Sequence, residues 1–344
     1  NLFAPIYLLK LGYSLSDVLL FYLIVNLAHA LTTFPSIAFG TRFGFVYLLF
    51  LNLPFTILFY AFLHTLNLCK WPLWVVALVS GVANCTFYVA YHFIFSELSK
   101  KEERGKEISV VNVVSSLVST CGPLIGGLVL SFSSFQLLFG LVSLLLCFSV
   151  LPITFAERKM RFEKRQRSRS PSFKRALKRS LLLPLACYGV EGVVNLVIWP
   201  VFVFLVVVKD FTALGALATA CTLLSWLFTL FIGRLTDLKR VLLLRAGAVL
   251  TSFAWLVKSA VRSAFQVFFV DSFYKASRTM LMIPFNAVYY DWCEKDVLTL
   301  LATREIVIQL GRVVFLSFLL LRPNVILAFF SGALASLGVL FFAS

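Results

Sequence analysis

Three charged residues, Asp271, Lys275 and Arg278, lie within an otherwise apolar stretch at residues 263–290. Their spacings of four and seven residues place all three on one face of a helix. Asp271 follows Arg262 by nine positions, which puts it about 13 Å into the stretch at about 1.5 Å per residue. Charges at such a depth in a membrane are costly and are typical of a functional site. One acid and two bases predict a site for an anionic or zwitterionic solute. The alternative is a structural Asp271–Lys275 pair.

Two further stretches carry buried charge. Glu191 stands between glycines in the stretch 181–208, with Asn195 one turn later, and we expect it to be the acid partner of Arg278. This contact is either part of a solute path or a static ion pair between two helices. Arg312, in the stretch 302–321, shares a helix face with Glu305. Its expected partner is Glu305, through Gln309, or the solute. The polar residues His29, Asn84 and His92 of the first half are interpreted as satisfied interior groups.

The composition explains how these residues are positioned. The chain is 60% hydrophobic and only 13% charged, too apolar for the surface of a soluble protein, so we expect an all-α integral membrane protein. Apolar stretches of about 20 residues suffice to cross the bilayer as helices. Eleven full spans and a partial first one are predicted, the full ones at residues 16–38, 45–66, 72–95, 108–130, 135–155, 181–208, 212–235, 241–257, 263–290, 302–321 and 325–343.

A basic run interrupts the spans at Glu157–Arg179, with eleven Lys or Arg and two Glu. It is predicted to be a cytoplasmic loop of a protein in the plasma or inner membrane, because positive residues mark the cytoplasmic side. The net charge of +16 is therefore a topology signal, and no nucleic-acid partner is expected. The seven cysteines are scattered without a CxxC or His/Cys cluster, so no metal or cofactor is expected. No nucleotide-binding loop, HExxH or GxSxG motif indicates an enzyme.

The two halves of the chain read as repeats. Glu107 and Glu305, like Tyr91 and Tyr289, are separated by about 198 residues, which is typical of transporters built from parallel repeats. We therefore predict a six-helix bundle at residues 1–155, a linker at 156–180 and a second bundle at 181–344. The first bundle begins within its first helix, and we expect the front of that helix to be missing from the chain.

Several motifs add a family resemblance. Gly233–Arg240 reads GRLTDLKR, Ser36–Gly44 reads SIAFGTRFG with Gly40 in place of the acid, and Gly122–Gly127 reads GPLIGG. With the 6 + 6 organisation, the chain resembles the major facilitator superfamily, a 12-helix fold of two pseudo-symmetric halves. The resemblance implies that the stretches 72–95, 181–208 and 263–290 line a central cavity. Asn195, Tyr188 and the buried charges, Arg312 included, would then lie on the solute path, with Glu191 as a proton carrier.

The turn motifs predict a cytoplasmic gate. Asp237, close after Gly233, is placed to cap the helix that begins near Glu107, where the helix dipole is positive. We expect two ion pairs beside it, Arg240–Asp291 and Arg42–Glu97. The alternative is that all of these are solvated loop charges, each pair contributing little. In the Gly122–Gly127 element, Gly122 and Pro123 predict a bend, and Gly126 and Gly127 predict close approach between helices.

The resemblance implies a secondary active transporter that works by alternating access and is driven by an ion gradient, with protons as the expected coupling ion. The expected partners are a small solute, protons and the lipid bilayer, and a monomer is expected. The solute is predicted to be an anionic or zwitterionic metabolite, or an amphipathic compound that is exported. A different class stays open: a membrane sensor or assembly partner that keeps this fold without transporting.

Overall fold

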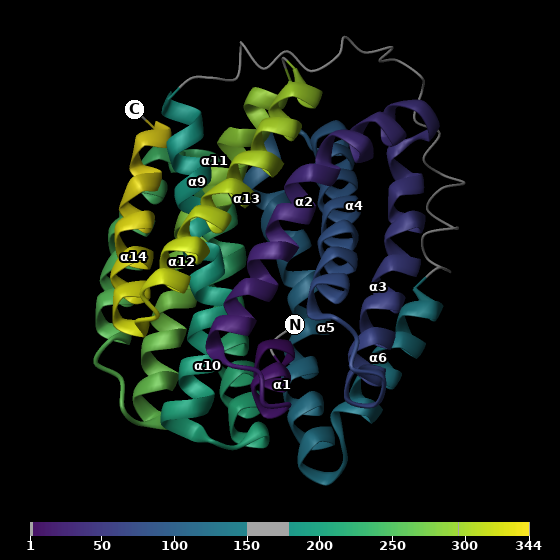
Figure 1. The fold of residues 1–344 in the computed structure, drawn as a ribbon. Helices are drawn as coiled ribbons and strands as arrows, with labels where there is room; N and C mark the ends of the chain where they lie inside the picture. The colour runs from purple at the N-terminus through teal and green to yellow at the C-terminus, as the bar shows by residue number, and fades with distance from the viewer. Residues whose placement is uncertain (1–2, 150–178, 295, 344) are drawn as a thin grey trace.

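The computed structural model describes residues 3–149, 179–294 and 296–343, and within these ranges every regular element is helical. The helices run up and down in one bundle, with α2 ending and α9 beginning at its upper end in Figure 1. Before the basic segment lie α1 (Ala4–Lys10), α2 (Leu15–Phe43), α3 (Phe45–Cys69), α4 (Leu73–Leu98), η1 (Lys101–Glu103), α5 (Arg104–Phe132) and α6 (Phe135–Phe148). After it lie α9 (Arg179–Val193), η2 (Val194–Ile198), α10 (Trp199–Phe202), η3 (Val203–Val208), α11 (Phe211–Lys258), α12 (Ala264–Cys293), α13 (Val297–Leu321), α14 (Val325–Gly338) and η4 (Val339–Ala343).

The predicted spans correspond to these helices. Seven helices in the described part of the chain are long and apolar enough to cross a membrane. The others are short, as α6 is, or carry the charges noted above, as α12 and α13 do. The spans predicted at 212–235 and 241–257 are joined in α11, where Lys239 has non-helical dihedrals (φ −136°, ψ 49°). The turn motif therefore breaks α11 close to where a break was predicted.

One predicted span is not a regular α-helix. From α9 through η3 the chain alternates between α-helix and two π-helical stretches on either side of Trp199 and Pro200. Proline cannot donate its backbone hydrogen bond, and π-helical turns are often found at functional sites. The irregular stretch includes Asn195.

Local sequence signals explain where helices begin. Ser14 and Asp17 form a reciprocal capping box at the start of α2, and Ser263 and Gln266 do the same for α12. Each box satisfies backbone donors that the first turn of a helix leaves free. These caps fix the starting points of two helices that carry site residues.

The two halves of the chain meet along two helix pairs, α2 with α13 and α5 with α11. Glycines allow the second contact. A Cβ on Gly105 would lie 2.7 Å from the carbonyl oxygen of Gly233, and one on Gly127 would meet the backbone of Phe211. The approach predicted at Gly126 and Gly127 is confirmed, since a Cβ on Gly126 would also meet the ring of Phe3. Gly122 and Pro123, which predicted a bend, do not interrupt the helix, because α5 continues through both residues.

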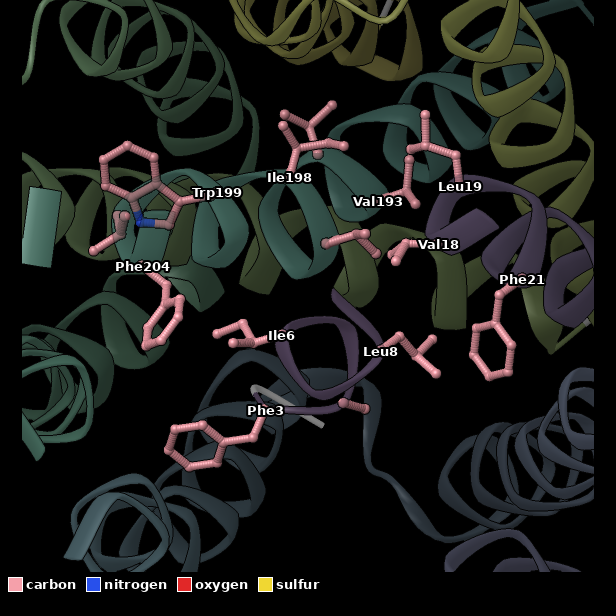
Figure 2. Packing of buried hydrophobic residues seen from close by; sticks show 14 of the residues in the cluster. Phe3, Ile6, Leu8, Val18, Leu19, Phe21, Val193, Ile198, Trp199 and Phe204 are labelled. Atoms are coloured by element: carbon pink, nitrogen blue, oxygen red, sulfur yellow. The ribbon is translucent and has the colours of Figure 1, made fainter. Parts of the chain in front are cut away.

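The short α1 packs against both halves. Ile6 and Leu8 of α1, and Phe3 directly before it, are buried in one hydrophobic cluster with residues of α2 and of the irregular stretch around Trp199. Figure 2 shows Ile6 on the side of Trp199 and Phe204, and Leu8 on the side of Val18 and Phe21. Residues 156–178 of the predicted linker lie outside the described residues, and the division at 1–155, 156–180 and 181–344 stays a prediction.

Candidate functional site

A central cavity of about 480 Å³ lies between the helices of the two halves. Its lining comes from α2, α3 and α4 of the first half, and from the stretch 193–203, α11, α12 and α13 of the second. Its charged lining residues are Asp271, Lys275 and Arg312, and His29 and Asn195 also line it. On α2 and on α12 these residues lie in the first half or near the middle of the helix. The cavity therefore lies away from the bundle end at which both of these helices finish.

Glu191 is fully buried and has two partners on α12. The Nε atom of Arg278 lies 3.1 Å from each carboxylate oxygen, and the hydroxyl of Tyr274 donates a hydrogen bond to Oε1. The predicted contact between Glu191 and Arg278 is confirmed. Neither residue is part of the cavity lining, although Asn195 and Lys275, one turn away on the same segments, are.

Asp271 is shared by two lysines. Lys275 lies 3.5 Å away on the same helix, as predicted, and Lys258 at the end of α11 lies nearer, at 2.9 Å. Lys275 also donates to the hydroxyl of Thr222 and to the carbonyl oxygen of Ala218. Asp271 and Lys275 thus form a polar strip on the cavity wall.

Lys258 is the last residue of α11 and stands one position beyond the span predicted at 241–257, where a lysine usually marks membrane topology. Its side chain is fully buried. The ammonium group lies 3.5 Å from the ring centroid of Tyr274, 4.2 Å from Trp199 and 4.4 Å from Trp255. Cation–π contacts of this kind stabilise a desolvated ammonium. The aromatic residues could have indicated in the sequence that Lys258 is buried. Trp255 stands three positions before it, but Trp199 and Tyr274 belong to other segments of the chain.

Arg312 is half-buried and lines the cavity. Its Nη1 atom lies 3.2 Å from Gln309 and 3.4 Å from Asn26, and its Nε atom has no hydrogen-bond partner among the described residues. No carboxylate of the described chain lies within ion-pair distance of it. The predicted link through Gln309 to Glu305 is wrong, because Glu305 has partners on the other half of the molecule.

Glu305 joins the two halves. Its Oε2 atom lies 3.0 Å from Nε2 of His29 on α2, and Oε1 lies 3.7 Å from Nε2 of His92 on α4. Arg304 lies beside it, with Nε 3.8 Å from Oε1. His92 is also hydrogen-bonded to the hydroxyl of Tyr290 at 2.6 Å. The two histidines, which were interpreted as satisfied interior groups, therefore share one buried carboxylate as a partner.

Tyr188 does not line the cavity. Its ring stacks on Phe285 at 5.4 Å between centroids, and the guanidinium of Arg304 lies 5.5 Å from it. Tyr188 is thus placed beside Arg304, outside the lining of this cavity.

The charged turn motif lies at the end of the bundle opposite α1. Asp237 accepts hydrogen bonds from the backbone N–H groups of Gly105 (2.8 Å) and Lys106 (3.1 Å). It caps the start of α5 as predicted, where the helix dipole favours a negative charge. Arg240 forms an ion pair with Asp291 at the end of α12, also as predicted. Gly233 allows this arrangement, because a Cβ at its position would collide with Ser109 of α5.

The expected Arg42–Glu97 pair is not formed. Both side chains are exposed at the ends of α2 and α4, and Arg42 lies over the ring of Phe43 instead. The arginine that connects the halves here is Arg104, which is 2% exposed and lies 2.6 Å from Asp291 and 3.1 Å from Glu294. We call Arg104, Asp237, Arg240, Asp291 and Glu294 the end cluster. Sequence reasoning missed Arg104 because it stands in a run of loop charges.

A bundle of long apolar helices with charges around a central cavity is typical of a polytopic membrane protein. The family model described as Major Facilitator Superfamily matches residues 1–208. The chain belongs to the major facilitator superfamily, and it is a multi-pass membrane transporter of that family and not an enzyme. No curated protein matches the chain.

Solved structures show the same fold. FucP of E. coli, a fucose:proton symporter, in its outward conformation has a TM-score of 0.70 at 12% identity over 96% of this chain and 90% of FucP. A bacterial homologue of the iron transporter ferroportin in its outward-facing state gives 0.69 at 15% identity, over 98% and 93%. The human organic anion transporter MFSD10 gives 0.61 at 18% identity, over 98% and 88%. At these identities the likeness concerns the fold alone.

Proposed function

We propose that this transporter carries a small organic anion through the central cavity by alternating access. The observation that supports the proposal most strongly is Arg312, a guanidinium on the cavity wall without a carboxylate partner in the described chain. A half-buried cation that is balanced only by neutral amides binds a carboxylate or phosphate well, because charge-assisted hydrogen bonds are strong in a site of low polarity.

The wider charge distribution favours the same solute. Two cations, Lys275 and Arg312, line the cavity, and Lys258 and Arg278 lie next to residues that line it. Asp271 and Glu191 are the carboxylates paired with these four cations, and Glu305, beside the lining residue His29, is balanced by Arg304. An anionic solute would reduce this positive excess, whereas a cation would add to it. The human neighbour MFSD10 is described as an organic anion transporter, which is in line with this proposal.

The aromatic part of the wall favours anions with an apolar portion. Phe21, Tyr22, Phe59, Tyr88 and Trp199 line the same cavity, and such side chains provide apolar contact area for a ligand. The proposal therefore includes both anionic metabolites and amphipathic anions that would be exported. The direction of transport does not follow from it.

The end cluster is proposed to act as the gate. Arg104, on the first half, bonds to Asp291 and Glu294 on the second, and Asp237 of the second half caps α5 of the first. These bonds must break for the halves to separate at this end. We place this end in the cytoplasm of a plasma or inner membrane because α9, which the basic run precedes in the sequence, begins at this end, and we infer a monomer. Two of the structural neighbours are outward-facing, as a closed cytoplasmic gate would require.

Proton coupling is the energy source that we propose. Glu191 is fully buried between Arg278 and Tyr274, and a carboxylate in such a position is a candidate proton carrier. FucP is described as a fucose:proton symporter, so the shared fold accommodates this kind of coupling. A sensor that binds the same anion without transporting it is the alternative.

Thermal unfolding of the purified protein with a panel of organic anions tests the anion site. A ligand at about 100 times its Kd stabilises the native state by about 2.7 kcal/mol. We expect at least one organic anion to raise the melting temperature of the wild type and of Arg322→Gln, an exposed arginine at the end of the same helix. Arg312→Gln should lose this response. An equal rise in all three proteins, or a response to organic cations only, would contradict the proposal.

A further inference from the structure

A buried hydrogen bond connects the cavity with the contact between the two halves. His29 lines the cavity, while its Nε2 atom lies 3.0 Å from Oε2 of Glu305. Glu305 does not line the cavity, and both side chains are buried, His29 at 2% and Glu305 at 3% exposure. His29 thus lies between the cavity and a carboxylate that does not face it.

The connection continues away from the cavity. Beyond Glu305, Oε1 faces His92 at 3.7 Å, and His92 is hydrogen-bonded to Tyr290 at 2.6 Å. Tyr290 directly precedes Asp291 of the end cluster. Each step crosses from one half of the chain to the other, so the series runs between the halves from the cavity toward the proposed gate.

The charge of the His29–Glu305 pair depends on the side chains around it. The titratable and charged side chains around it are Cys85, Tyr88 and His92 of α4, Tyr188 of α9, Tyr289 and Tyr290 of α12, and Arg304 and Arg312 of α13. Arg304 balances the charge of Glu305 while both histidines are neutral. A proton added here therefore leaves one positive charge, and an anion in the cavity beside His29 would offset it.

We propose that His29 and Glu305 form a proton-binding site that couples proton uptake to closure of the end-cluster side. The proton comes from water in the cavity and binds to the imidazole of His29. It converts the hydrogen bond between a neutral imidazole and the carboxylate of Glu305 into an imidazolium–carboxylate pair between the halves. Two opposite charges at this distance attract each other more strongly than a neutral donor and a carboxylate do. When the halves separate at this end, the pair is pulled apart and the proton can leave. This inference rests on the proposed alternating access, but it does not depend on which solute is carried.

Cys293 provides a reporter for closure. It is 4% exposed at the end of α12, two residues beyond Asp291, whereas Cys69 at the end of α3 is exposed. N-ethylmaleimide should modify Cys293 only when this end opens. The ratio of the Cys293 rate to the Cys69 rate, read by peptide mass spectrometry on the full-length protein without solute, therefore measures opening. His64, the third histidine of the chain, bonds to the backbone of Gln136 and supplies a matched control.

Between about pH 5.5 and about pH 8, where histidine changes its charge, we expect the ratio to rise about tenfold in the wild type and in His64→Gln. His29→Gln and Glu305→Gln should remove this pH response, and His29→Lys should keep the ratio low at both pH values because its charge is permanent. An unchanged pH response in His29→Gln, Glu305→Gln and His29→Lys, or none in the wild type, would overturn the proton site. Since no solute is present, either outcome is independent of the anion test on Arg312.

Discussion

Lys258 combines a positive charge with complete burial. Its ammonium group is held by Asp271 at 2.9 Å and by three aromatic rings, and Asp271 keeps Lys275 at 3.5 Å as a second partner. Removing one member of a buried pair is destabilising, because the other charge is left without compensation. The two partners should therefore contribute unequally to the stability of the fold.

A double-mutant cycle on this pair should show strong coupling. We expect Asp271→Asn to lower the free energy of unfolding by about 3–5 kcal/mol, because it leaves Lys258 buried without a carboxylate. Lys258→Met should cost less, since Lys275 still reaches Asp271. The double variant should cost clearly less than the two single changes added together. Additive losses in thermal or denaturant unfolding would show that the pair is not coupled.

The sequence predicted the partner of a charged side chain correctly where both residues lie within predicted spans. Glu191 and Arg278 could be paired because each is the leftover charge of its own helix. Lys258 and Arg104 could not, because each stands at a helix end, where a lysine or arginine usually marks membrane topology. Glu305 was given the wrong partner because helix periodicity describes neighbours on one helix only, and His29 and His92 come from two others.

At the level of helices, α5 tests which glycines are needed for packing. A Cβ on Gly127 would collide with the backbone of Phe211, whereas a Cβ on Gly122 would meet nothing within 4 Å. Gly127→Ala should therefore lower the free energy of unfolding by about 1–3 kcal/mol through overpacking. Gly122→Ala on the same helix should leave it unchanged or raise it by up to about 1 kcal/mol, because alanine favours helix. Equal effects in the two variants would show that α5 and α11 do not approach as described.

The helices themselves were predictable because a bilayer requires long apolar helices. The break in α11 at Lys239 was predicted as well, since the charged turn motif cannot lie in hydrocarbon. The course of α5 through Pro123 was not. A proline removes one backbone hydrogen bond but does not have to end a helix that neighbouring helices support, and α5 has α11 packed along it.

Over the whole molecule, charge is divided between two places. The end cluster ties Arg104 and the start of α5 to the ends of α11 and α12, while the cavity lies farther along the bundle with more cations than carboxylates around it. The His29–Glu305 pair lies between the halves in the region that separates these two places. This arrangement is what the proposed alternating access requires: a closed end, a cavity and a connection between them. The division into two six-helix repeats remains a prediction.

Flux of an organic anion tests the central proposal most directly. The anion that gives the largest thermal shift would be radiolabelled, and its uptake measured in proteoliposomes that contain the wild type, Arg312→Gln or Arg322→Gln. We expect the wild type and Arg322→Gln to take up more of the anion than protein-free liposomes do, and to do so faster when a proton gradient is imposed. Arg312→Gln should lose at least about 90% of the uptake rate, and a tenfold loss corresponds to about 1.4 kcal/mol. If the anion binds to the wild type but does not cross the membrane, the protein is a sensor with the fold of a transporter and the central claim is wrong.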